Sequence, residues 1–294
     1  MAALSRRREP PLIRRDDRGW FVRLQGEPDS PVDLADHYPD LRGQWVEADA
    51  LDRALIAISS PLGIEALPAD EAMPLLDAYH DGVAALDGRF GAWGAACLAE
   101  IDARQVDVLV TRGFVGLSVP AAAIATPAGL ARCGPLLERL ERLDAPLLVH
   151  PGPAPWSPAS ELEPDMPDWW PAMSGYVTQM SSAWHAFVAG GRRAHSKLRV
   201  LFAMLAGGGP LHSERLAARG GPGLKVDDGL FVDSSSYGVQ MLDHAVRVLG
   251  VDQLVYGSDR PVLGSLDCPL GEAVRHAMLV TNPSRLLQHK EVLA

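Results

Sequence analysis

His150 and Asp259 are the two residues whose type and position best suit catalysis, because each directly follows a short apolar run. His150 follows residues 146–149 and precedes Pro151, which turns the chain out of a sheet, and Asp259 follows residues 254–258. In a barrel of parallel strands, side chains at the carboxyl ends point into the mouth, where active sites lie. A carboxylate there can bind a divalent metal or take a proton from metal-bound water. The alternatives are a histidine bonded to backbone and an aspartate that caps the next turn.

Three further residues near predicted strand ends are candidates for contacts with a substrate. Arg260 can bind a substrate carboxylate or pair with an acidic side chain of the protein. Tyr237 lies in the turn that follows the apolar run at 230–233, so it can meet a substrate. Trp156 lies in a proline-rich loop, where a large aromatic side chain needs a surface to cover. That surface is either the mouth of the barrel or the contact of a homodimer.

Short apolar runs alternate with longer stretches of helical period from residue 51 onward. This alternation is typical of βαβ units and predicts a parallel sheet. The predicted strands are 51–59, 92–99, 114–119, 146–150, 198–205, 230–233 and 254–258. The predicted helices are 69–87, 127–143, 176–194, 211–218, 239–249, 270–279 and 283–288. For the helix at 127–143, Thr126 is the expected N-cap and Pro127 occupies the first turn.

The seven predicted strands are one fewer than a closed (β/α) barrel requires. Residues 1–50 contain arginine and proline clusters, a turn-rich segment at 26–31 and no convincing buried strand. We therefore interpret them as a long connection between a strand that precedes Met1 and the strand at 51–59. The prediction is an α/β protein, a TIM-type (β/α)8 barrel formed as one domain by residues 1–294, with its first strand missing.

The composition favours a small-molecule partner and a cytoplasmic location. The net charge of −10 argues against binding to nucleic acid or to an anionic membrane surface. The three cysteines are too few and too widely spaced for a disulfide framework, which fits a reducing compartment. The chain has no apolar run of the ~20 residues that span a bilayer and no secretory signal. Its strong preference for arginine over lysine is typical of a GC-rich bacterial gene.

Three segments, 113–117, 147–153 and 255–261, resemble the amidohydrolase-related family, in the branch that includes aminocarboxymuconate-semialdehyde decarboxylase. The resemblance extends over roughly residues 45–290. It implies a metal-dependent hydrolase barrel with a divalent metal, usually zinc, that activates water for hydrolysis or supports nonoxidative decarboxylation. His150 and Asp259 match two of the family's metal positions, and Asp259 also matches a catalytic position.

Two departures from the family pattern put the usual chemistry in doubt. The family's first strand ends in Asp-x-His-x-His, and this sequence contains no His-x-His pair. The sixth strand of the family ends in Ala-His-x-Gly-Gly, whereas Met204 holds the histidine position here. A thioether cannot transfer protons. His212 can either take over that role and meet the substrate or simply begin a surface helix. We therefore expect a metal that is weakly held or absent.

Three hypotheses for the function follow. The first is a hydrolase of a small carbon–nitrogen or ester substrate, in which metal-activated water attacks a carbonyl and Asp259 acts as the base. The second is a nonoxidative decarboxylase that uses the same site. The third is a truncated or noncatalytic barrel homologue, and we expect coding sequence upstream of Met1 to supply a strand that ends in Asp-x-His-x-His.

Overall fold

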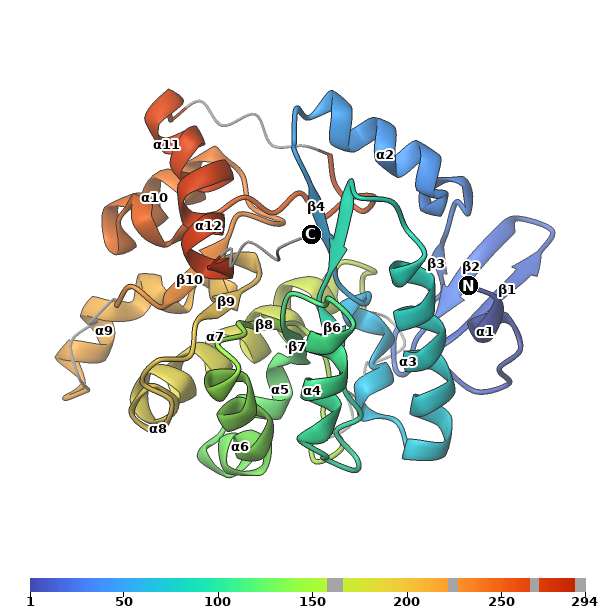
Figure 1. The fold of residues 1–294 in the computed structure, drawn as a ribbon, viewed down its shortest axis with the longest axis horizontal. Helices are drawn as coiled ribbons and strands as arrows, with labels where there is room; N and C mark the ends of the chain where they lie inside the picture. Colours follow the sequence, from blue (N-terminus) through green and yellow to red (C-terminus); the bar gives the residue numbers. More distant parts are fainter. Residues whose placement is uncertain (158–165, 222–226, 265–269, 289–294) are drawn as a thin grey trace.

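Parallel strands form the centre of the computed structural model, which describes residues 1–157, 166–221, 227–264 and 270–288 (Figure 1). One two-stranded sheet pairs β4 (Ala54–Ile56) with β5 (Phe90–Ala92). A second sheet begins at β6 (Gly94–Ala95), which continues β5 after a break at Trp93. It runs in the order β6, β7 (Leu117–Pro120), β8 (Leu147–His150), β9 (Val200–Phe202), β10 (Leu230–Asp233) and β11 (Leu254–Val255). Every pair in these two sheets is parallel.

Each of the seven predicted strands overlaps a strand of this array. The predicted strand at 92–99 corresponds to two observed strands, β5 and β6, and β5 begins two residues before the predicted start. The predicted α/β fold class is therefore confirmed. The array is open, because within the described ranges β4 pairs only with β5 and β11 only with β10. Each of these two strands thus has a free edge, as the count of seven predicted.

Helices cover the outside of the strand array. The predicted helices are confirmed as α3 (Ala69–Ala84), α6 (Pro127–Arg142), α7 (Val177–Ala186), α9 (Ser213–Ala218), α10 (Val239–Leu249), α11 (Glu272–His276) and α12 (Asn282–Leu287). Wide helical turns extend two of them: η4 (Pro171–Tyr176), η5 (Phe187–Gly191) and the short α8 (Arg192–Ala194) adjoin α7, and η8 (Ala277–Thr281) follows α11. The Oγ1 atom of Thr126 accepts a hydrogen bond from Gly129 N, which confirms the predicted N-cap. Helices α4 (Arg104–Thr111) and α5 (Ala121–Ile124) were not predicted.

Residues 1–50 are more structured than a connection, so the expectation that they contain no strand was wrong. They form α1 (Ala2–Ser5), an antiparallel sheet of β1 (Leu12–Asp16), β2 (Gly19–Arg23) and β3 (Ser30–Pro31), and helix α2 (Pro39–Ala48). Ile13 is buried in a cluster with Ile58 and Ile64 that also contains Leu75 and Leu76 of α3. The antiparallel sheet lies beside α3 in Figure 1. The strand was missed because β1 buries only its first two residues and then continues into charged ones.

The parallel strands bury both of their faces, as the alternation of side chains along a strand requires. The inner layer contains Trp93, Leu148, Leu201, Phe231 and Val255, with Leu286 from α12 against it. The outer layer, which packs against the helices, contains Leu147, Val149, Val200, Phe202, Leu230, Val232 and Leu254. No helix of the described residues is both long and apolar enough to span a bilayer.

Arg199, at the amino end of β9, connects three segments at the end of the barrel opposite the mouth. Its guanidinium donates to Asp144 Oδ1 at 2.5 Å, to the carbonyl of Asp144 at 2.6 Å and to the carbonyl of Leu286 at 2.7 Å. Because Arg199 is buried, Arg199→Met leaves two carbonyls and a carboxylate without their donor. We expect the free energy of unfolding to fall by about 1–2 kcal/mol. This is less than the loss of a fully buried ion pair would cost, because the Asp144 side chain is partly exposed. Urea denaturation with Arg193→Met, an exposed arginine, as the control would measure this.

Candidate active site

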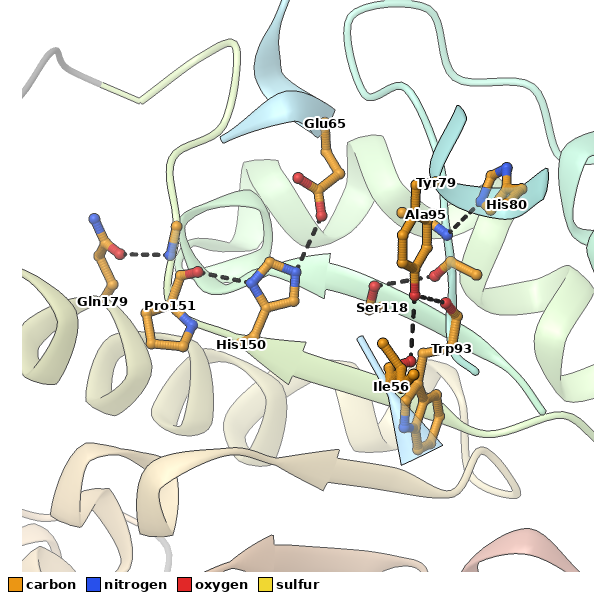
Figure 2. A network of polar contacts seen from close by, with 12 residues as sticks. Ile56, Glu65, Tyr79, His80, Trp93, Ala95, Ser118, His150, Pro151 and Gln179 are labelled. Carbon is orange, nitrogen blue, oxygen red and sulfur yellow. Dashed lines mark hydrogen bonds and ion pairs between the residues drawn. The ribbon is translucent and has the colours of Figure 1, made fainter. Parts of the chain in front are cut away.

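His150, the last residue of β8, lies in a buried polar contact with a residue that sequence reasoning missed (Figure 2). Its Nε2 atom is 3.1 Å from Glu65 Oε1, and its Nδ1 atom is 2.7 Å from the carbonyl oxygen of Pro151. The exposed fractions are 2% for His150 and 1% for Glu65. The second oxygen of Glu65, Oε2, is buried and has no hydrogen-bond partner among the residues that the structure describes. The mouth of the barrel therefore holds an imidazole and a carboxylate that are both removed from water.

Two short 3-10 helices after β4 place Glu65 over His150. They are η2 (Ser60–Leu62) and η3 (Ile64–Ala66), and Gly63 between them adopts φ 60°. A Cβ atom at Gly63 would lie 2.9 Å from Pro153 Cγ, so glycine lets this segment approach the loop that follows β8. The sequence signal for Glu65 was weak, because it follows β4 by several residues. The one available sign was that Glu65 stands between two apolar residues, Ile64 and Ala66, which suggests a buried segment.

The backbone around the break between β5 and β6 is held by side chains drawn in Figure 2. The hydroxyl of Tyr79 donates to the carbonyls of Ile56 and Trp93, and His80 Nε2 accepts from Ala95 N. Burial, and next the charge of Arg112, lowers the pKa of His80 to about 4, so this ring is neutral and can accept. These contacts satisfy polar groups that a regular ladder would have paired.

The loop after β8 is fixed against α7. Gly152 N donates to Gln179 Oε1 at 2.9 Å (Figure 2). Gly152 has φ 149°, and a Cβ atom there would lie 3.1 Å from Pro120 Cβ and 3.2 Å from the carbonyl of Ser60. The Pro151 carbonyl that faces His150 therefore belongs to a segment with little freedom to move.

Met204, at the position where the family carries histidine, begins a turn of unusual backbone conformation at the end of β9. Met204, Leu205 and Ala206 have φ values of 54°, 46° and 54°, and Gly207 and Gly208 continue with positive φ. Residues other than glycine cost about 1–2 kcal/mol each in this region. Strain of this kind is concentrated at functional sites, which makes the end of β9 part of the candidate site.

Asp233, the last residue of β10, holds this turn in place. Its Oδ1 atom accepts hydrogen bonds from Met204 N at 2.9 Å, from Ser235 N at 3.0 Å and from the Ser235 hydroxyl. Burial raises the pKa of Asp233 to about 6, the hydrogen bonds from Ser235 and Met204 oppose the rise, and the charge of Asp259 adds to it. Asp233 was not a sequence candidate, although its position at the end of a predicted strand was a usable signal.

Asp259 lies beyond the end of β11, next along the sheet from Asp233. Its Oδ2 atom accepts a hydrogen bond from the Ser236 hydroxyl at 2.7 Å. The residue is exposed, yet the surrounding protein removes enough water from the carboxyl to raise its pKa. Gly257 permits the close approach of this segment to β10, because a Cβ atom there would lie 2.9 Å from Asp233 Cγ. The two carboxyl groups thus influence each other electrostatically at the mouth.

The guanidinium of Arg260 is paired with an acid of the protein, which is one of its two predicted roles. It donates to Asp49 Oδ2 at 3.0 Å and to Asp49 Oδ1 at 2.9 Å, and it lies 5.2 Å from the centroid of the Trp45 ring. This contact joins the segment after β11 to the end of α2. Contact of Arg260 with a substrate remains a prediction.

The other predicted substrate contacts lie in different surroundings. Tyr237 packs against the outer core cluster, and burial raises its pKa. Trp156 packs against the same cluster under the guanidinium of Arg132, 5.0 Å from the ring centroid, and its buried indole N–H has no acceptor in the described part of the chain. His212 is exposed at the end of η6 (Met204–His212). Burial, and next the charge of His212, lowers the pKa of His185. Contact of these three residues with a substrate remains a prediction.

The described residues contain one buried pair of side chains of the types that bind metals, Glu65 and His150. Among them no group of three histidine, cysteine, aspartate or glutamate side chains is close enough to hold a metal ion. The pair of Glu65 and His150 nevertheless fits a cation, because Oε2 of Glu65 is buried without a partner and the imidazole faces the same carboxylate. Glu65 and His150 are two ligand types in direct contact, and the predicted pairing of His150 with Asp259 as metal ligands remains a prediction.

Solved structures with the same fold include several decarboxylases. The apo form of IDCase from Metarhizium anisopliae matches with a TM-score of 0.78 at 17% identity, covering 98% of this chain and 93% of that one. The 5-carboxyvanillate decarboxylase of Novosphingobium aromaticivorans, complexed with manganese and 4-hydroxy-3-methoxy-5-nitrobenzoic acid, matches with a TM-score of 0.69 at 19% identity, covering 84% and 79%. The 2,6-dihydroxybenzoate decarboxylase from Rhizobium matches with a TM-score of 0.68 at 18% identity, covering 88% and 93%. No curated protein matches the sequence.

The fold and the residues at its strand ends define a parallel α/β barrel protein of the amidohydrolase kind, with acidic groups and a histidine at the carboxyl ends of the strands. The amidohydrolase family model matches residues 70–288, so the chain belongs to the amidohydrolase family. The resemblance identified in the sequence is thereby confirmed. Enzymes of this family are hydrolases or carboxy-lyases.

Proposed function

We propose that this chain is a carboxy-lyase that removes carbon dioxide from a small carboxylic acid, with Asp259 as the proton donor. The observation that carries the proposal is the pair of carboxyl groups at the carboxyl ends of β10 and β11, where Asp233 accepts hydrogen bonds from Met204 N and Ser235 N and Asp259 accepts one from the Ser236 hydroxyl. Loss of water raises the pKa of both carboxyl groups. A raised pKa favours the protonated form, and a decarboxylase must deliver a proton to carbon. The hydrolase mechanism predicted first uses the same aspartate as a base, so the two functions differ in the direction of proton transfer at Asp259.

The proton balance of the reaction assigns different roles to the two aspartates. The bond between the substrate carbon and its carboxylate breaks, the electron pair stays on that carbon, and carbon dioxide leaves. Asp259 Oδ1 or Oδ2 supplies the proton that the carbon takes up, and water then reprotonates the exposed carboxyl. The Ser236 hydroxyl orients Asp259 through its hydrogen bond to Oδ2. Asp233 holds Met204 and the end of β9 in position.

A divalent metal ion bound at His150 would supply positive charge beside the carboxylate of the substrate. Glu65 and His150 are the residues that would hold it. The manganese in the matched 5-carboxyvanillate decarboxylase and the hydroxylated aromatic acids named for the matched decarboxylases support a divalent metal and a substrate of that class. Zinc, the metal predicted from the sequence, remains a proposal.

Two substrate panels distinguish decarboxylation from hydrolysis. Hydroxylated benzoic acids are incubated with the manganese-supplemented protein in D2O, and released carbon dioxide and the deuterium content of the product are measured. We expect carbon dioxide together with one deuterium at the carbon that carried the carboxylate. Cleavage of nitrophenyl esters or anilides without release of carbon dioxide would instead establish the hydrolase hypothesis. Inactivity on both panels, with the fold verified by circular dichroism, would support a noncatalytic homologue.

A further inference from the structure

We propose that Glu65 is a metal ligand and forms, with His150, a binding site for one divalent cation at the carboxyl ends of β4 and β8. The proposal deepens the proposed function, because it assigns a ligand from the loop after β4 to the metal of the carboxy-lyase. It rests on three observations, namely the contacts of the two imidazole nitrogens, the buried second oxygen of Glu65 and the spacing of the two side chains.

The contact with Pro151 determines which nitrogen of His150 carries the proton. A carbonyl oxygen can only accept, so Nδ1 must be the donor across the 2.7 Å to Pro151. In the neutral ring Nε2 then presents a lone pair, and it faces Glu65 Oε1 at 3.1 Å. A lone pair and a carboxylate oxygen repel each other, so a positive species must lie between or beside them. Histidine ligands of metals typically donate their other ring N–H to a backbone carbonyl or carboxylate in this way.

A shared proton would satisfy only half of the carboxylate. It would join His150 Nε2 to Oε1 and leave Oε2 buried without a partner. A buried carboxylate oxygen without compensation is strongly disfavoured. Within the described residues, the ion pair with His150 is the only one that Glu65 makes, so no arginine or lysine compensates this oxygen. A divalent cation neutralises the whole carboxylate and accepts the lone pair of the imidazole.

The spacing also suits two ligands of one ion. Ligands that each lie 2.0–2.2 Å from a tetrahedral metal are separated by about 3.3–3.6 Å, so a small outward movement of Nε2 and Oε1 from their 3.1 Å separation would admit the ion. A set of one imidazole nitrogen and carboxylate oxygens suits zinc or manganese better than calcium, which takes oxygen ligands only. Because the protein supplies two ligand residues, we expect weaker binding than at a closed zinc site, with substrate or water completing the shell.

The test measures metal binding directly, apart from activity. The full chain is treated with a chelator and titrated with Mn²⁺, and bound ion is followed by electron paramagnetic resonance and calorimetry. We expect one equivalent to bind and to raise the melting temperature, since binding to the folded state stabilises it. Glu65→Gln, which keeps the size of the side chain, should weaken binding at least tenfold, and His150→Ala should do the same. Glu100→Gln, which changes an exposed glutamate, should bind as the wild type does.

Three outcomes would overturn the assignment. If Glu65→Gln binds Mn²⁺ as tightly as the wild type while His150→Ala does not, Glu65 is not a ligand. If the wild type releases carbon dioxide but binds no Mn²⁺, the metal site fails while the carboxy-lyase proposal stands. If either variant fails to fold, anomalous diffraction from Mn²⁺-soaked wild-type crystals decides the matter. A peak that contacts both Glu65 and His150 supports the site, and a peak elsewhere refutes it.

Discussion

Asp259→Asn is expected to lower the rate of carbon dioxide release by about 10²–10⁴-fold, with the fold and the affinity for substrate retained. A positioned general acid contributes that range to catalysis, and an amide cannot donate the proton that the substrate carbon needs. Asparagine has the same shape, and its side-chain oxygen can still accept the hydrogen bond from Ser236. The loss should therefore appear in kcat much more than in KM.

The matched control is Asp252→Asn, because Asp252 is an exposed aspartate at the opposite end of β11. It should keep wild-type activity. In the wild type, activity should decline as pH rises above the elevated pKa of Asp259, since only the protonated carboxyl donates. Equal activity of Asp259→Asn and the wild type would remove Asp259 from the mechanism and with it the carboxy-lyase proposal.

The sequence was sufficient for the strand array because parallel strands buried on both faces give continuous apolar runs. The run at 146–149 followed by His150, for example, became β8 with the histidine as its last residue. The N-terminal sheet has the opposite character. In β1 only Leu12 and Ile13 are buried, so its charged remainder carries little periodic signal.

The candidate site was predicted in part for a related reason. His150 and Asp259 follow strand ends directly, whereas Glu65 is brought over β8 by two helical turns and a glycine. Its partner His150 is 85 residues further along the chain, and no local pattern encodes that pairing. Arg260 illustrates the same limit, because its bond to Asp49 spans 211 residues and no local pattern encodes that pairing.

Asp233→Asn is expected to remove a pH dependence of stability that the wild type shows between about pH 4 and pH 7. The pKa of Asp233 is raised in the folded state from 3.8 to about 6, so folding disfavours the ionised form. The contribution of Asp233 to the free energy of unfolding is fully present below pH 3.8, the pKa of this carboxyl in the unfolded chain, and is lost as pH rises through its folded-state pKa of about 6. Two pKa units correspond to about 3 kcal/mol. Because the residue is partly exposed, we expect the wild type to lose about 2 kcal/mol over this interval through Asp233.

Urea denaturation at pH 4 and pH 7 would measure the effect, with Asp252→Asn again as the control. Asparagine can still accept all three hydrogen bonds at Oδ1, so the variant should match the wild type at pH 4 and exceed its stability at pH 7. Parallel pH profiles for the two proteins would contradict the raised pKa. If Asp233→Asn is more stable than the wild type but releases carbon dioxide more slowly, the chain retains an aspartate that lowers its stability because that aspartate serves activity. Active sites commonly sacrifice stability for function in this way. The two carboxyl groups are linked electrostatically in the folded protein, since the charge of Asp259 is one of the causes that raise the pKa of Asp233.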